Sequence, residues 1–187
     1  MDSTNKPKHY LIIGIVFILL VGLIVFVGGK QWFFIDDRDK KEVIEHVLNE
    51  QFSTADEELI RLIDSPENAT ILDGTAEVMS EENTELNAYL EEQYSAYFTE
   101  NIYQEYLTTY AFMYQMPAYY SNHTLHADDI NLEKNDNEDG LYNFTVSVSY
   151  GENEEAVVSG RARVNDQEVI SYFEILEDDG LQHVLSN

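Results

Sequence analysis

Hydrophobic residues follow three different patterns along this chain, and each pattern predicts a different kind of element. Residues 10–27 read YLIIGIVFILLVGLIVFV, a run without a charged residue, and Gly28 and Gly29 extend it to 20 residues. At ~1.5 Å per residue, a helix of this length spans about 30 Å, the thickness of the hydrocarbon core of a bilayer. The run therefore predicts one transmembrane helix over residues 10–29.

A cleaved signal peptide is the alternative explanation of this run. Signal peptides have a shorter apolar core and small residues at the cleavage site. Here Trp32, Phe33 and Phe34 follow the glycine pair, and aromatic residues beside an apolar span are typical of the membrane interface. We therefore expect an uncleaved anchor, preceded by a tail over residues 1–9 and followed by a juxtamembrane segment over residues 30–39.

The flanking charges do not decide the orientation of this anchor, because lysine or arginine residues lie on both sides of it. The chain has no cysteine, which fits a domain outside the cytoplasm that avoids unwanted thiol chemistry. A short N-terminal tail before the apolar run is the usual arrangement of a signal-anchor. We expect a single-pass protein of a bacterial cell membrane, with its N-terminus in the cytoplasm and residues 40–187 outside.

The second pattern has the 3.6-residue period of a helix. It predicts a first helix over residues 38–50, with an apolar face formed by Val43, Ile44, Val47, Leu48 and Phe52. Thr54 and Glu57 predict a capped second helix that ends at Ser65-Pro66. A short β segment over residues 69–74 and a long helical stretch from residue 80 follow. Thr99 is a candidate cap at a break in that stretch, and Met116-Pro117 is expected to end the helical half.

The third pattern alternates with period two, as in a half-buried strand. Residues 141–150 are the clearest example, because Tyr142, Phe144, Val146 and Val148 alternate with polar residues. Similar alternation covers residues 128–133, 156–164 and 169–176, and Asn-, Asp- and Gly-rich turns separate the four segments. The short connections predict an antiparallel meander, and the order of elements predicts an α+β domain with helices on one face of a curved sheet.

This order of elements resembles the nuclear transport factor 2-like superfamily, whose cone-shaped domain has the layout α-α-β-α-β-β-β-β. The resemblance covers roughly residues 40–185 and includes the helical pair KEVIEHVLNEQFSTADEELIRLID, the segment ATILDG and the tail VISYFEILEDDGL. Members of that superfamily include enzymes, ligand binders and interaction modules, so the resemblance implies a fold and leaves the function open. An anchor before such a domain also looks like the assembly subunits of type IV secretion and Gram-positive conjugation machines.

The charge of the chain limits its partners. The formal net charge is −26, and residues 42–160 contain only two basic residues, Arg61 and Lys134. Phosphate binding needs clustered lysine and arginine, so we expect no nucleic-acid partner. An acidic solvated surface, adaptation to a salty exterior and attraction to a basic partner or to cations all remain open.

Candidate catalytic or metal-binding residues lie before and within the first predicted strand. Enzymes of the resembled superfamily use Asp, His and Tyr inside the cone, and this part of the chain offers a set of such residues, namely Tyr119, Tyr120, His123, His126, Asp128 and Asp129. In a regular strand, side chains three positions apart point to opposite faces, so His123 and His126 are not expected to converge. We therefore expect surface or turn histidines and predict no catalytic residue, no metal site and no cofactor.

Three further features have a structural and a functional explanation. The turn over residues 135–140 lacks the glutamate that a calcium loop needs at its twelfth position, so we expect a solvated hairpin turn. Arg161 and Arg163 are expected to form salt bridges with acidic neighbours, with an anion or partner contact as the alternative. A helical stripe of tyrosines is expected to pack in the core, with a pocket lining or an interface as the alternative; it comprises Tyr94, Tyr97, Tyr103, Tyr106 and Tyr110.

These observations favour a membrane-anchored, non-enzymatic interaction module that contacts other envelope proteins or a second copy of itself. A small-ligand-binding or enzymatic cone is the alternative. A deep cavity with a polar floor would support that alternative, and a cavity filled by Tyr, Phe and Leu side chains would argue against it.

Overall fold

The computed structural model describes residues 37–65, 84–151 and 153–187, all of which belong to one compact unit, Ile35–Asn187. The predicted transmembrane helix over residues 10–29 and the predicted short strand over residues 69–74 lie outside the described residues. In the parts of the chain that are described, no helix is both long and apolar enough to cross a bilayer.

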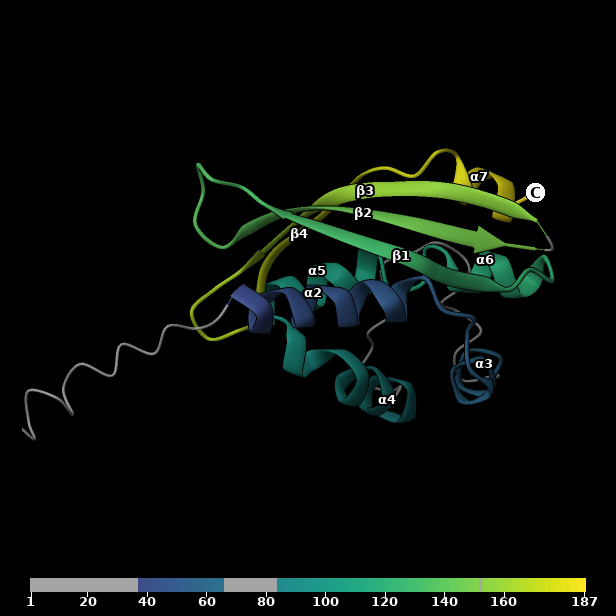
Figure 1. Ribbon diagram of the computed structural model, residues 1–187. Coiled ribbons are helices and arrows are strands. Elements are labelled where there is room, and N and C mark those ends of the chain that lie inside the picture. The colour runs from purple at the N-terminus through teal and green to yellow at the C-terminus, as the bar shows by residue number, and fades with distance from the viewer. Residues whose placement is uncertain (1–36, 66–83, 152) are drawn as a thin grey trace, which may run out of the picture. The chain divides into compact units, whose positions relative to one another are not determined.

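Four antiparallel strands form one sheet in the order β1-β2-β3-β4, so each strand pairs with its neighbour in sequence (Figure 1). Their bounds are Leu125–Lys134 (β1), Leu141–Tyr150 (β2), Glu154–Val164 (β3) and Ile170–Glu177 (β4). The predicted meander is confirmed, and each predicted strand overlaps an observed one. Short polar turns connect the strands, and two of them place a glycine at positive φ, Gly140 at 67° and Gly151 at 70°.

The two faces of the sheet differ in burial because of the alternation in sequence. Tyr142, Phe144, Val146 and Val148 of β2 are fully or almost fully buried. Their neighbours Asn143 and Thr145 are exposed on the other face. The pairing register shifts once between β1 and β2 and twice between β3 and β4, and such bulges increase the twist and bend of a sheet.

Helix α2 (Asp37–Gln51) confirms the first predicted helix. Its apolar stripe is buried, with Ile44, Val47 and Leu48 at 0% exposure. The opposite face of α2 is charged and solvated, which is the pattern of a helix that packs on a core through one side.

Helix α3 (Glu57–Ile63) begins later than the predicted capping box. The prediction that Thr54 caps this helix was wrong: Asp56 is the N-cap, and its carboxylate accepts a hydrogen bond from Leu59 N at 2.6 Å. The hydroxyl of Thr54 instead donates to the carbonyl of Leu125 at 3.2 Å and accepts from its N–H at 3.1 Å. Thr54 therefore ties the α2–α3 loop to the start of β1.

The long helical stretch is divided, as the position of Thr99 predicted. Helix α4 (Thr84–Tyr94) continues into the 3₁₀ turn η2 (Ser95–Tyr97), and helix α5 (Glu100–Thr109) begins after extended residues. Thr99 is the N-cap residue of α5, although its side chain forms no capping hydrogen bond. Its backbone N–H donates to Ile170 O at 2.9 Å, so the break fastens the helical half to β4.

The helical half does not end at Met116-Pro117, and that prediction was wrong. Both residues lie in the first turn of α6 (Gln115–Tyr120). Proline is tolerated there because the first N–H groups of a helix have no partner within it. A short helix that was not predicted, α7 (Leu181–Leu185), follows the sheet and buries Leu181 and Leu185.

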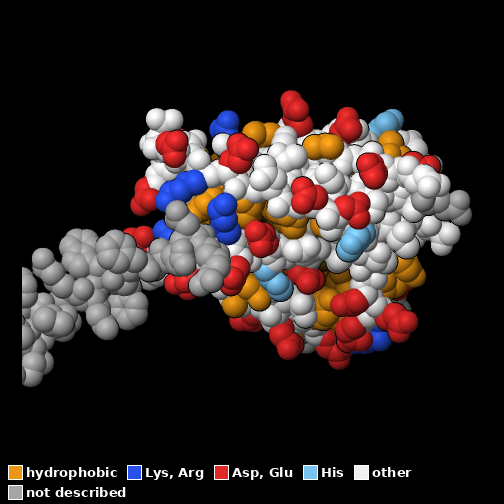
Figure 2. Space-filling view, in the orientation of Figure 1, with side chains coloured by type: hydrophobic (Ala, Val, Ile, Leu, Met, Phe, Trp, Pro, Cys, Tyr) orange, Lys and Arg blue, Asp and Glu red, His pale blue; other side chains and the backbone are white. Residues whose placement is uncertain are grey.

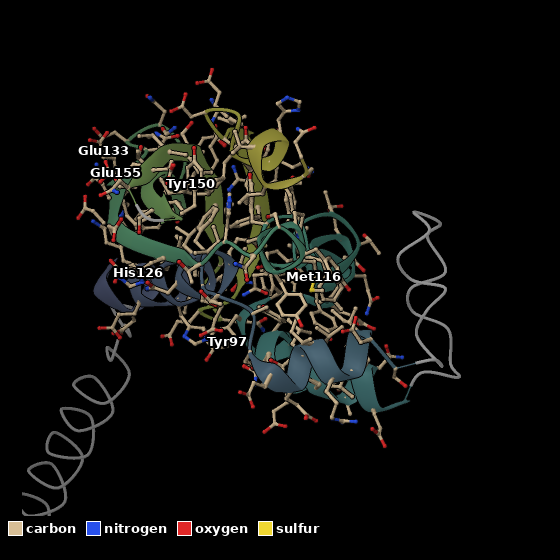
Figure 3. All side chains as sticks on the ribbon, turned by 90° about the vertical axis from the view of Figure 1, so that its right-hand side faces the viewer. Tyr97, Met116, His126, Glu133, Tyr150 and Glu155 are labelled. Atoms are coloured by element: carbon tan, nitrogen blue, oxygen red, sulfur yellow. The ribbon has the colours of Figure 1, made fainter. Side chains whose placement is uncertain are left out.

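The predicted α+β class is confirmed. The described helices lie on one side of the sheet, except for α7, which follows β4 at the C-terminal end of the chain (Figure 1). Helices α2 and α5 lie next to the sheet, and α3 and α4 lie farther from it in both ribbon views (Figure 1 and Figure 3). The core forms between these layers.

Candidate functional site

Aromatic rings fill the space between α5 and the sheet, where a cone-shaped domain would hold a ligand. Phe173 of β4 is at the centre of this cluster. Its ring centroid lies 5.5 Å from that of Tyr106, 5.3 Å from that of Tyr110 and 5.6 Å from that of Phe144. The ring of Phe98 lies tilted against that of Tyr106, with the centroids 4.5 Å apart. Aromatic side chains therefore fill the interior around Phe173.

Tyr106 and Gln51 are paired with each other within this interior. The hydroxyl of Tyr106, which is 1% exposed, donates to Gln51 Oε1 at 2.5 Å, and Gln51 Nε2 donates to Tyr110 O at 2.6 Å. Burial, followed by the nearby Tyr94 and Glu50, raises the pKa of Tyr106 well above its ordinary value. This hydroxyl stays neutral near pH 7 and donates to a hydrogen bond inside the core.

The histidines and aspartates before and within β1 are only partly brought together. His123 precedes the strand and stacks on Tyr150 with ring centroids 6.1 Å apart. His126, labelled in Figure 3, lies on β1 with a side chain that is 76% exposed and 3.9 Å from Asp128. Asp129 is also exposed. The two histidines thus have different surroundings: His126 is exposed, whereas His123 is half-buried and its Nδ1 has no hydrogen-bond partner among the described residues.

The acidic turn at residues 135–140 is a hairpin turn, as predicted. Asn135 Oδ1 accepts from Asn137 N at 2.9 Å, and Asn135 N donates to Leu141 O at 2.8 Å. Across residues 37–65 and 84–187, apart from residue 152, no group of three or more His, Asp or Glu side chains is arranged to hold a metal ion.

Arg163 forms the predicted salt bridge, with Glu138 of the β1–β2 turn, and its guanidinium carbon lies 6.0 Å from the centroid of Tyr172. Arg161 is exposed and lies opposite Glu174 in the register of β3 and β4. The pair therefore fits the structural explanation, with a charged neighbour for each arginine.

The tyrosine stripe packs in the core as predicted, since Tyr94, Tyr103 and Tyr106 are at most 9% exposed. The helix tyrosines with the greatest exposure are outside the stripe, on α6. Tyr119 is 42% and Tyr120 is 52% exposed, and their rings form an edge-to-face pair at 5.4 Å. The Tyr120 hydroxyl donates to Asp64 at 3.0 Å.

A groove of about 630 Å³ runs between α4 and α5. The groove lies at the break over Ser95–Tyr97, where α4 ends and α5 begins. Buried rings of Phe98 and Tyr103 form its apolar part. The remaining lining residues are polar or acidic: Asn87, Glu91, Ser95, Glu100 and Gln104.

The charge around this groove is almost entirely negative. Burial, followed by the charge of Glu91, raises the pKa of Tyr103 to about 12, so its hydroxyl stays neutral. Among the residues that the structure describes, no Lys or Arg forms an ion pair with Glu91 or Glu100. The cation on the nearby α3 helix, Arg61, is already held by Glu58 at 2.8 Å and Glu85 at 3.4 Å.

Other described cations gather where α2 begins, near the β1–β2 and β3–β4 turns. Lys41 Nζ donates to Leu132 O near the end of β1 at 2.9 Å, and Arg163 pairs with Glu138 of the adjoining turn. Most of the blue atoms in Figure 2 lie at this end. The set comprises Lys40, Lys41, Lys134, Arg161 and Arg163.

Sequence reasoning did not identify the groove. Glu91 and Glu100 are nine positions apart and belong to different helices, and only the geometry of the break brings them to one site. The signal in the sequence was the candidate cap Thr99, but a cap does not reveal the direction in which the next helix runs.

Comparison of the chain with protein-family models, with curated proteins and with solved structures found no match.

Proposed function

We propose that this protein is a membrane-anchored, non-enzymatic interaction module whose domain lies outside the cytoplasmic membrane. The observation that carries the proposal is the filled interior around Phe173, which leaves the outer surface as the place where partners are recognised. The exposed pair Tyr119 and Tyr120 and the groove between α4 and α5 are the surface features suited to contact.

The membrane attachment rests on the sequence. The apolar run over residues 10–29 has the length of a membrane span, and only seven residues separate it from the start of α2. The domain would therefore work close to the bilayer surface. Other envelope proteins or a second copy of this chain are the partners that such a position offers, within an envelope, secretion or conjugation assembly.

The proposal includes a nuclear transport factor 2-like architecture, which the arrangement of helices on one face of a four-stranded antiparallel sheet supports. A small-ligand or enzymatic function is the weaker candidate. Such a function would need an acid or base with a suitable pKa next to space for a substrate. Burial instead raises the pKa values of core tyrosines such as Tyr94 and Tyr106, further from neutrality.

The orientation can be tested with single cysteines, because the natural chain has none. We expect Asn137→Cys, in the exposed β1–β2 turn, to react with a membrane-impermeant maleimide in intact cells. Ser3→Cys, in the N-terminal tail, is the matched control and should react only after lysis. Labelling of Ser3→Cys in intact cells with protection of Asn137→Cys would reverse the proposed orientation.

Contact and catalysis can be separated by two sets of substitutions. The first is the double variant Tyr119→Ser with Tyr120→Ser, tested in a cross-linking pull-down from cells. The amount of captured partner should fall by at least about tenfold, because aromatic anchors dominate interfaces. His123→Ala, His126→Ala and Asp128→Ala together should leave capture and the cellular phenotype unchanged. A lost phenotype in the triple variant, with an unchanged circular dichroism spectrum, would reject the interaction module in favour of an enzyme.

A further inference from the structure

The groove between α4 and α5 combines two properties that together select one class of ligand. Its apolar part is aromatic, since Phe98 and Tyr103 line it and are 4% and 9% exposed. Its edge carries the carboxylates of Glu91 and Glu100, one from each helix. A ligand that satisfies both features has an apolar stem and a positively charged head.

We infer that this groove binds lysine or arginine side chains of a basic segment of a partner protein. The methylene stem of such a side chain packs on an aromatic ring, and its charged head reaches the carboxylates at the rim. The inference rests on the proposed function, which supplies a protein partner, and it adds the chemistry of that partner.

Charge complementarity supports this occupant over others. Arg61 on the nearby α3 is already neutralised by Glu58 and Glu85, and Lys40 on α2 pairs with Asp166 of the β3–β4 turn. Glu91 and Glu100 have no such partner among the described lysines and arginines. An acidic peptide, a nucleic acid or an anionic lipid surface would be repelled from this region.

A divalent cation fits the groove less well than an organic one. Calcium takes about six to eight oxygen ligands, whereas the groove offers two carboxylates, and the described residues contain no group of three acidic or histidine side chains that could hold a metal ion. The volume of about 630 Å³ is also within the range of roughly 300–1,000 Å³ that is typical of sites for organic ligands.

The chain provides a matched control for the test. Glu92 is adjacent to Glu91 on α4, and Glu105 is on α5 with Glu100, but neither Glu92 nor Glu105 lines the groove. Both are exposed. Glu91→Gln with Glu100→Gln removes two charges from the groove, and Glu92→Gln with Glu105→Gln removes the same number from the same helices outside it.

The experiment measures fluorescence anisotropy of a labelled ten-residue peptide of alternating arginine and glycine, added to the full-length protein in phosphatidylcholine nanodiscs. At about 150 mM salt, where the Debye length is ~8 Å, remote charges contribute little. We expect the groove variant to weaken binding by about tenfold or more and the control variant by less than about twofold. Thermal melting of both variants verifies that they fold.

Each outcome decides the inference. Equal weakening by both variants, or no binding by the natural chain, would overturn it. Spermine tests whether the ligand is a free polyamine. If spermine displaces the peptide at a concentration near its own dissociation constant, and if this displacement depends on Glu91 and Glu100 in the same way, the groove would be assigned to a free polyamine. That result would also overturn the inference of a protein segment. A failed peptide test combined with intact partner capture in cells would reject the groove and leave the interaction module standing.

Discussion

Replacing Phe173 with alanine is expected to destabilise the domain by about 3–5 kcal/mol. Phe173 is 4% exposed, and its ring contacts the rings of Phe98, Tyr110 and Phe144 as well as that of Tyr106. Truncation would remove the centre of the cluster and leave a cavity that the rigid sheet and α5 cannot close. Since a domain of this kind is stable by about 5–15 kcal/mol, the loss would be a large fraction of the total.

Urea unfolding of the Ile35–Asn187 unit, followed by circular dichroism, measures this loss. With a slope of about 2 kcal/mol/M, the midpoint should fall by about 2 M. Tyr119→Ala is the matched control, because that ring is 42% exposed, and it should change stability by less than about 1 kcal/mol. Similar costs for the two substitutions would mean that the cluster around Phe173 does not dominate the core.

The second large effect is expected at Gly160 of β3, where a single added methyl group has no space. A Cβ atom at this position would lie 2.2 Å from Glu174 O and 2.3 Å from Phe144 Cζ. The first neighbour is backbone of β4 and cannot move without disturbing the strand pairing. Gly160→Ala should therefore destabilise the domain by about 3 kcal/mol or more, at the upper end of the range for overpacked sites.

Gly180 provides the comparison for this substitution. It has φ 78°, and nothing lies within 4 Å of a Cβ atom built on it. Gly180→Ala therefore adds only the strain of a left-handed conformation, about 1 kcal/mol. Thermal melting of the two variants under the same conditions checks the difference. A smaller cost at Gly160 than at Gly180 would show that β4 shifts readily and that the sheet is not closely packed at this point.

The sheet and the first helix could be predicted because their signals are local. The alternation over residues 141–150 repeats with a period that only a strand places on one face, and the observed β2 has the same bounds. The apolar stripe of α2 likewise specifies a helix without reference to the rest of the chain. In both elements, local preference and tertiary burial favour the same structure.

Predictions failed where a distant residue competes with a local interaction. Thr54 matches a capping box, but its hydroxyl bonds to Leu125, 71 positions away, and Asp56 takes its place as the cap. Pro117 matches a helix end, but it lies in the first turn of a new helix. The groove was not predicted because the relative position of Glu91 and Glu100 depends on the direction that α5 takes after the break.

The contacts of α2 have a consequence for the order in which the domain is completed during synthesis. Lys41 bonds to Leu132, 91 positions later, and Gln51 bonds to Tyr110, 59 positions later. At roughly 5–20 residues per second, the ribosome needs on the order of 5–20 s to make the chain between Lys41 and Leu132. During that interval the apolar face of α2, with Ile44 and Leu48, lacks the strand that finally covers it. Helix α2 is therefore made well before the strand that covers it, and newly made chains expose its apolar face to proteases and chaperones during that interval.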